Sequence, residues 1–238
     1  MRVLGIESSS STASVAIVDD DKLIAEYTIN NTMKHSKTLM PMLEEMLKRL
    51  EIKVDTIELI SVSEGPGSFT GLRIGSATAK GIAHGLNLKI ASIPTLEVIA
   101  SQVQVPGARV GVVVYARARE VYFATYDIEL KDGHFYPTIV EPIISLEVED
   151  LVSKLQSLNL DSNYFLVGDG VERFEEDFSA LNDAIVRLAP IYCSFSAKNV
   201  ALLGIKRYHD NDVVTCYEQK PYYHKKSQAE REYEERRK

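Results

Sequence analysis

The stretch that decides the fold is Gly65-Pro66-Gly67-Ser68-Phe69-Thr70-Gly71-Leu72-Arg73-Ile74-Gly75. It joins a predicted strand over 59–62 to a predicted helix over 70–84, and a helix that begins after such a turn can hold an anion on its free backbone amides. The spacing matches neither the lysine-containing phosphate loop nor the G-x-G-x-x-G loop that follows a first strand. The same glycines suit a plain tight turn, so a phosphate role and a purely structural role both stay open.

On either side of this turn, the sequence runs through one order of elements twice. The apolar pattern predicts strands at 2–7, 13–18, 22–29, 59–62 and 89–93, with helices at 37–50, 70–84 and 95–103. The second half predicts strands at 110–115, 120–128, 135–142, 164–167 and 184–188, with helices at 147–158, 171–178 and 196–208. We therefore expect an α/β protein of two duplicated βββαβαβα lobes, residues 1–105 and 106–225, followed by a charged tail at 226–238.

Composition and charge exclude several classes of protein. The 238 residues are 45% hydrophobic and 26% charged, as in an ordinary globular protein. The net charge of -7 gives the molecule no overall positive field for nucleic acid, so RNA contact is expected to run through a partner, with a local basic path at Lys220, Lys225 and Lys226 left open. The sequence shows neither a signal peptide nor a membrane span, and Cys193 and Cys216 form no C-x-x-C pair, which together favour a cytoplasmic location.

Local signatures of a metal site or a hydrolase are missing from the sequence. Its five histidines are His35, His84, His134, His209 and His224, and no two of them have the three- to five-residue spacing of a local metal clamp. No G-x-S-x-G stretch marks a serine nucleophile. We expect neither a metal nor a nucleophilic serine in this protein.

Two features of the predicted helices indicate a surface for another protein. Small residues recur every fourth position in and just after helix 70–84, as Gly71, Gly75, Ala79 and Ala83 in one stripe and Ala77, Gly81 and Gly85 in another. Because each glycine costs about 1 kcal/mol of helix stability relative to alanine, the stripes favour close approach of a second helix, from this chain or from a partner. In helix 37–50, Met40, Met42 and Met46 are expected to lie partly outside the face of Leu39 and Leu43, as a flexible binding surface, with gap-filling core residues as the alternative.

Several stretches together resemble the TsaB (YeaZ) family. They are Gly5-Ile6-Glu7-Ser8-Ser9, His35-Ser36, the stretch 65–75, Ala79-Lys80-Gly81, Pro94-Thr95-Leu96-Glu97, Glu120-Val121-Tyr122, Gly168-Asp169-Gly170 and Pro221-Tyr222-Tyr223. The resemblance covers nearly the whole chain, and the stretch 65–75 is its most specific part. It implies the two-lobed actin-like (ASKHA, ribonuclease H-like) α/β fold and a role in making threonylcarbamoyladenosine beside the anticodon of transfer RNA.

The resemblance also implies that this chain lacks the transfer chemistry of the paralogous TsaD family. Members of that family carry a metal-binding H-x-E-x-H segment, and the corresponding stretch here is Thr95-Leu96-Glu97-Val98-Ile99. Both histidines are replaced, and the one remaining carboxylate, Glu97, does not hold a catalytic iron or zinc. The chain is therefore expected to have no catalytic residue and no metal.

Nucleotide binding is expected to be vestigial. ATPases of the implied fold place a polar hairpin with an acidic residue in each lobe and a late glycine loop around the adenosine. The residues here that resemble these parts are Glu7, Ser8, Ser9, Gly168 and Gly170, and Tyr115 stands where family members usually have Asp. No cofactor is expected, and weak ATP binding stays open.

The resemblance therefore implies a non-catalytic scaffold subunit that binds a TsaD-type catalytic paralogue, helps to recruit a TsaE-type ATPase and reaches transfer RNA through that complex. The methionines and small residues place its interface at His35, Ser36, Leu39, Met40, Met42, Leu43, Met46, Thr70, Arg73, Ile74, Ala77 and Lys80. The same face is expected to form a homodimer when the chain is alone. The alternatives are an ATP-dependent small-molecule kinase of the same fold and a metallopeptidase, which the histidine spacing disfavours.

Overall fold

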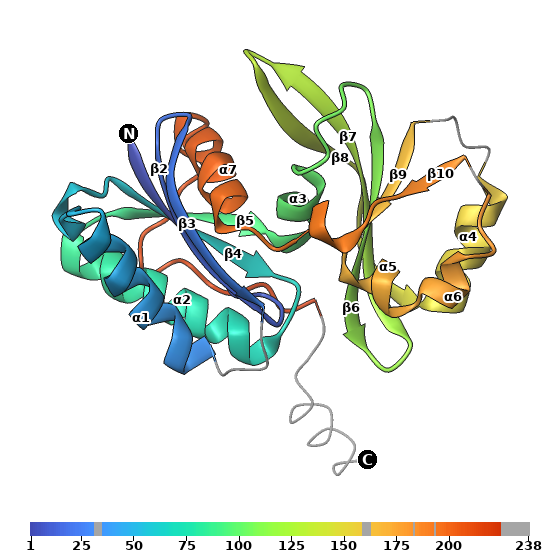
Figure 1. Ribbon diagram of the computed structural model, residues 1–238, viewed down its shortest axis with the longest axis horizontal. Helices are drawn as coiled ribbons and strands as arrows, with labels where there is room; N and C mark the ends of the chain where they lie inside the picture. The colour runs from blue at the N-terminus through green and yellow to red at the C-terminus, as the bar shows by residue number, and fades with distance from the viewer. Residues whose placement is uncertain (31–34, 159–162, 183, 193, 225–238) are drawn as a thin grey trace, which may run out of the picture.

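The computed structural model describes residues 1–30, 35–158, 163–182, 184–192 and 194–224 of the chain (Figure 1). They form two lobes that lie side by side, and each lobe is built on one five-stranded sheet. Within the described ranges, the structure contains no helix with the length and apolar character needed to cross a membrane.

The first sheet has the strand order β3-β2-β1-β4-β5. Its strands are β1 (Arg2–Glu7), β2 (Thr12–Asp19), β3 (Lys22–Asn30), β4 (Leu59–Gly65) and β5 (Lys89–Pro94). β1 pairs antiparallel with β2 and parallel with β4, so the meander of β1 to β3 continues into a parallel half. β1 and β2 are buried along almost their whole length because helices cover both faces of the sheet.

The second sheet repeats this topology as β10-β9-β6-β7-β8. Its strands are β6 (Arg109–Arg117), β7 (Glu120–Lys131), β8 (His134–Glu147), β9 (Tyr164–Val167) and β10 (Ile185–Arg187). β6 takes the place of β1, with an antiparallel neighbour on one side and a parallel neighbour on the other. The predicted duplication of an α/β unit is confirmed.

Seven α-helices connect the strands within the described residues. They are α1 (His35–Arg49), α2 (Phe69–Leu86), α3 (Thr95–Ala100), α4 (Val148–Ser157), α5 (Asp169–Arg173), α6 (Glu175–Phe178) and α7 (Ala197–His209), with single 3-10 turns at Val54–Thr56 and Pro190–Tyr192. The helix predicted over 171–178 begins two residues earlier and is interrupted at Phe174, whose φ of -118° and ψ of 38° are not helical. α2 is capped at both ends, by the Ser68 side chain and by the left-handed Asn87.

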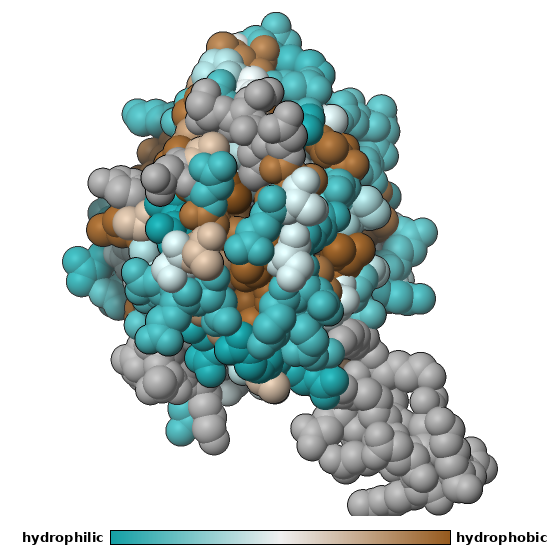
Figure 2. Space-filling view, turned by 90° about the vertical axis from the view of Figure 1, so that its right-hand side faces the viewer, coloured by the Kyte–Doolittle hydropathy of each residue, from teal (hydrophilic) through white to brown (hydrophobic). Residues whose placement is uncertain are grey.

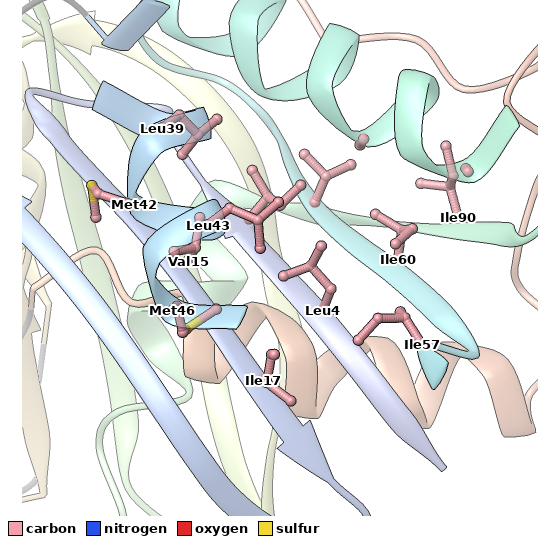
Figure 3. Close-up of a cluster of buried hydrophobic side chains, with 14 of the residues drawn as sticks. Leu4, Val15, Ile17, Leu39, Met42, Leu43, Met46, Ile57, Ile60 and Ile90 are labelled. Carbon is pink, nitrogen blue, oxygen red and sulfur yellow. The ribbon is translucent and has the colours of Figure 1, made fainter. Parts of the chain in front are cut away.

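The core of the first lobe lies between α1, α2 and the sheet (Figure 3). Leu39, Met42, Leu43 and Met46 point from α1 onto the strands and are at most 6% exposed. The prediction of an exposed surface at Met42 and Met46 is therefore wrong. These four residues stand at positions i, i+3, i+4 and i+7, which share one helical face, so the methionines fill the core.

The last helix of each half packs on the sheet of the other half. α7 lies on the first sheet, where the Ser61 Oγ on β4 donates to the backbone oxygen of Val200 at 2.7 Å. α3 places Leu96 and Ile99 in the buried cluster of β6 and β7, and Figure 1 shows it between the two lobes. The lobe boundary after residue 105 stays a prediction. The two helices pack across that point of the chain, so each lobe includes a helix from the other half of the sequence.

Candidate functional site

The turn after β1 is closed by hydrogen bonds within the first lobe. Glu7, Ser8 and Ser9 are at most 1% exposed. Glu7 Oε1 accepts from both the backbone N–H and the Oγ of Ser9 at 2.6 Å, and Ser8 Oγ donates to the backbone oxygen of Gly71 at 2.9 Å. These donors are engaged inside the protein, so the arrangement does not present them to a phosphate.

The glycine-rich turn before α2 packs directly on this β1–β2 turn. Ser68 N donates to the backbone oxygen of Ser9 at 2.6 Å, and a Cβ added at Gly67 would lie 2.1 Å from that same oxygen. Gly65 has φ of +117° and approaches the backbone oxygen of Tyr222, which would lie 2.5 Å from an added Cβ. The geometry favours the structural role of these glycines, because close backbone approach requires residues without a side chain.

The corresponding turn of the second lobe is closed in the same way. Gly168 has φ of +111°, and a Cβ added there would lie 2.2 Å from the backbone oxygen of Val113. Asp169 accepts from the Tyr115 N–H at 2.9 Å, and burial raises the pKa of Asp169 to about 6. The Tyr115 ring lies 4.1 Å from the guanidinium of Arg173, so it packs on α5 where the family resemblance expects an Asp.

The segment that corresponds to the TsaD metal motif forms an ion pair instead. Glu97 Oε2 accepts from Arg207 on α7 at 2.7 Å, and the two side chains are 13% and 25% exposed. Burial raises the pKa of Glu97, and the Arg207 charge opposes that rise. Thr95 and Ile99 are fully buried and offer a hydroxyl and a hydrocarbon where a transition metal needs imidazoles. These residues do not fit a metal, and the described part of the chain contains no cluster of three His, Cys, Asp or Glu side chains placed to hold one.

Arg207 was not foreseen as a site residue, although the sequence carried a signal for it. Its position is in step with Val200 and Leu203 on the apolar face of the predicted last helix. A charged residue on such a face needs a carboxylate partner, since burial of an unpaired charge is costly. The Arg207 charge also acts on Glu64: burial raises the pKa of Glu64, and the positive charge of Arg207 partly opposes that rise.

The residues of the predicted partner surface fall into a buried group and an accessible group. Leu39, Met42, Leu43 and Met46 lie in the core, while Ser36 and Met40 of α1 are exposed. His35 begins α1, and its side chain lies outside the described residues. On α2, Thr70, Arg73 and Ala77 are exposed, and Ile74 and Lys80 are half-buried. Seven of the twelve predicted interface residues are therefore at least partly accessible.

The two stripes of small residues on α2 have opposite environments. Gly71, Gly75, Ala79 and Ala83 are buried, and a Cβ added at Gly75 would lie 2.2 Å from the Ser8 Oγ. The first stripe thus allows close contact with this lobe's own sheet and first turn. Ala77, Gly81 and Gly85 are exposed, and in the part of the chain that the structure describes nothing lies within 4 Å of a Cβ added at Gly81 or Gly85. We call Thr70, Ala77, Gly81 and Gly85 the small-residue ridge.

The chain returns to α2 after α7 and packs along it. Gln219 Oε1 accepts from Ser76 Oγ at 2.6 Å, in a contact that is buried. Tyr222 N donates to the backbone oxygen of Glu64 at 2.7 Å, and Arg73 Nε donates to the Tyr223 hydroxyl at 3.2 Å. The resemblance at Pro221-Tyr222-Tyr223 was the only sequence signal for this segment, and it did not reveal that the segment holds α2.

Comparison with known proteins identifies the family. The family model described as "TsaD: tRNA N6-adenosine threonylcarbamoyltransferase" matches residues 22–231. The protein named "tRNA threonylcarbamoyladenosine biosynthesis protein TsaB" from Buchnera aphidicola subsp. Baizongia pistaciae is 29% identical over 180 residues, which are 74% of this chain and 78% of the relative. The protein of that name from Escherichia coli is 28% identical over 210 residues, which are 83% and 88% of the two chains.

A solved structure shares the fold. The structure described as "YeaZ from Pseudomonas aeruginosa" superimposes with a TM-score of 0.77 at 22% identity, covering 93% of this chain and 99% of that one. This likeness agrees with the repeated sheet order and with the two-lobed actin-like (ASKHA) fold expected from the sequence. With a family model that spans most of the chain and relatives aligned over most of their length, this chain belongs to the TsaB (YeaZ) group of the TsaD family.

Proposed function

We propose that this chain is a non-catalytic subunit in the synthesis of threonylcarbamoyladenosine in transfer RNA, and that it docks a TsaD-type catalytic paralogue. The names of its relatives support the pathway, since proteins called TsaB align over most of this chain. The ion pair of Glu97 with Arg207 supports a non-catalytic role, because it occupies the carboxylate that corresponds to the TsaD metal motif.

The observation that carries the docking proposal is the exposed small-residue ridge of α2. A partner helix can approach the α2 backbone closely there, because Gly81 and Gly85 present no side chain and no atom of the described residues lies within 4 Å of a Cβ added at either one. Met40 on α1 adds an exposed flexible side chain to this face. Gly75 and Ala79 are buried, so they serve the fold of the lobe.

Two further partners are proposed, a second copy of this chain and a TsaE-type ATPase. A second copy of this chain would use it to form a homodimer in the absence of the paralogue, since a twofold contact pairs one surface with itself. The TsaE-type ATPase would join the assembled complex and supply its nucleotide chemistry. This chain would need no cofactor of its own, in keeping with the closed turns at Ser9 and Gly168.

The docking proposal is tested by light scattering on a size-exclusion column. The chain is run alone and mixed with the TsaD-type paralogue of the same organism, as wild type, as Ala77→Glu and as Ala180→Glu. Ala180 is an exposed alanine of the second lobe, so this variant controls for the added charge. We expect a heterodimer peak with the wild type and with Ala180→Glu and loss of the peak with Ala77→Glu, at unchanged melting temperature.

Two outcomes would contradict different parts of the proposal, namely the docking face and the partner. A heterodimer that survives Ala77→Glu would rule out the ridge as the docking face while leaving the partner in place. Chains that run separately, even with nucleotide and the ATPase added, would rule out the partner. Isothermal titration of the chain alone with Mg-ATP is expected to show no heat, and a stoichiometric signal would revive the kinase alternative.

A further inference from the structure

An exposed cluster of aromatic residues and arginine lies where α2 begins. The Arg73 guanidinium carbon sits 3.8 Å from the centroid of the Phe69 ring and 5.9 Å from that of Tyr223. The two rings are 4.9 Å apart, and Tyr222 precedes Tyr223 on the same segment. Phe69, Tyr222 and Tyr223 are 36%, 43% and 39% exposed. We call Phe69, Arg73, Tyr222 and Tyr223 the aromatic cluster.

The cluster is held in place by backbone contacts. Tyr222 N donates to the backbone oxygen of Glu64 at 2.7 Å, and the Tyr222 backbone oxygen lies against Gly65. Gln219 anchors the same segment through its buried contact with Ser76. Arg73 Nε donates to the Tyr223 hydroxyl at 3.2 Å. A ligand would thus meet a surface that is already formed, which lowers the entropic cost of binding.

The charge around the cluster is opposite to that of the whole chain. α2 contains Arg73 and Lys80 but no Asp or Glu, and the described residues 219–224 contain Lys220 but no acidic residue. The chain as a whole carries a net charge of -7. The acidic residues next to these segments have other interactions, since Glu64 lies in the field of Arg207 and Glu218 accepts from Thr215. The local charge at this place therefore favours an anion, in contrast to the net charge of the chain.

We propose that the aromatic cluster binds unpaired nucleotides of RNA. Single-stranded RNA is bound where exposed rings stack with bases and a neighbouring cation contacts the phosphates, and this cluster has both. Tyr222 and Tyr223 offer ring surface, and the terminal nitrogens of Arg73 are the donors for a phosphate, since its Nε bonds Tyr223. The choice of transfer RNA as the ligand rests on the proposed function. The inference goes beyond that function because it assigns this subunit a direct contact with the RNA.

The test is fluorescence anisotropy with the full chain and two labelled probes. One probe is an anticodon stem-loop of transfer RNA, and the other is a blunt RNA duplex of the same length without unpaired bases. The variants are Arg73→Ala and Tyr223→Ala, with Lys53→Ala as the control. Lys53 is an exposed cation ahead of the start of β4, whereas the cluster lies beyond the end of that strand.

Each variant has a distinct expected result. Tyr223→Ala should weaken binding of the stem-loop by about fivefold or more and leave the duplex unchanged, because only unpaired bases stack on the ring. Arg73→Ala should weaken binding and reduce the slope of log affinity against log salt by about 0.7, as expected for one lost phosphate contact to a single strand. Lys53→Ala should bind like the wild type.

Several results would contradict this inference and leave the docking proposal unaffected. These are equal binding of the two probes, variants that bind the stem-loop like the wild type, and no binding at low salt by either the chain or its heterodimer. An Arg73→Ala variant that binds RNA normally but binds the paralogue more weakly would assign the cluster to a protein contact. Conversely, specific binding of the stem-loop by a chain that forms no heterodimer would leave this inference standing and contradict the docking proposal.

Discussion

The two glycine-containing turns at the same place in the two lobes can be compared directly. Gly65-Pro66-Gly67 comes at the end of β4 and Gly168-Asp169-Gly170 comes after β9, and each of these strands pairs in parallel with the first strand of its sheet. In both turns a glycine approaches a backbone oxygen, with added Cβ distances of 2.1 Å at Gly67 and 2.2 Å at Gly168. Both turns therefore depend on close backbone approach, although Gly67 meets the turn after β1 and Gly168 meets Val113 within β6.

The helices after the two turns differ in length and charge. The first turn leads into the 18 residues of α2, which contain no Asp or Glu. The second leads into α5 with five residues and α6 with four, and the acidic residues there are Asp169, Glu172, Glu175, Glu176 and Asp177. Figure 2 shows the outer side of the second lobe as largely hydrophilic with scattered hydrophobic spots. The glycines thus allow close backbone approach in both lobes, whereas the helices that follow them carry charges of opposite sign.

The largest expected effect comes from breaking the second turn with Gly168→Ala. The residue would take a φ of +111° and place its Cβ 2.2 Å from the Val113 oxygen. We expect the free energy of unfolding to fall by about 2–4 kcal/mol, measured by urea denaturation. Gly133→Ala is the control, because it has φ of +83° but open space around it. Equal losses in the two variants would show that backbone strain alone is responsible and that the contact with Val113 adds nothing.

The charge of the second turn gives a prediction for pH. Burial raises the pKa of Asp169 from 3.8 to about 6 in the folded state, so the folded protein holds this proton more tightly than the unfolded chain does. The stabilisation is complete below pH ~4 and is lost as the pH rises toward 6. Relative to Asp169→Asn, the wild type should lose about 3 kcal/mol of unfolding free energy over this window.

Urea denaturation at a series of pH values measures this difference. Asp150→Asn, an exposed position on α4, controls for the change in net charge. A constant difference between wild type and Asp169→Asn from pH 4 to 7 would show that Asp169 has the same proton affinity in both states.

A smaller effect is expected at the start of α2. The Ser68 Oγ accepts from Gly71 N at 3.3 Å and caps the helix, whereas α5 has no side-chain cap. Ser68→Ala should lower the free energy of unfolding by about 1 kcal/mol, and Ser68→Asp should retain most of it, since Asp also caps helices well. Thermal unfolding of the two variants checks this, and no loss in either would mean that the backbone contact of Ser68 with Ser9 alone fixes the helix start.

The smallest effect tests whether the small-residue ridge is open in the isolated chain. At a chain concentration too low for the homodimer, Gly81→Ala adds a methyl group where no atom of the described residues lies within 4 Å and should stabilise the lobe by about 0.5–1 kcal/mol, because alanine favours the helix. The melting temperature should rise by about 1–4 °C. A fall in the melting temperature would reveal a neighbour over the ridge, such as a second copy of the chain, and light scattering on the same sample would identify it.

Much of the fold could be predicted from patterns in the sequence, and so could part of the site. Alternating and continuous apolar runs located the strands within a few residues, and β1 has the predicted bounds. The exposed stripe of Ala77, Gly81 and Gly85 was visible as a spacing of four. The exposure of Met42 and Met46 was mispredicted, although their spacing from Leu39 already placed them on the core face. The spacing alone did not tell which of the two stripes on α2 was buried.

The sequence by itself determined the order of elements and the duplication, because these depend on residues close together along the chain. The tertiary structure alone decided where α7 and the segment after it pack. The contact of Glu97 with Arg207 joins residues 110 positions apart, and that of Arg73 with Tyr223 joins residues 150 positions apart. Such contacts form only when the sheets and helices have closed on one another, so local spacing does not identify which residues become partners.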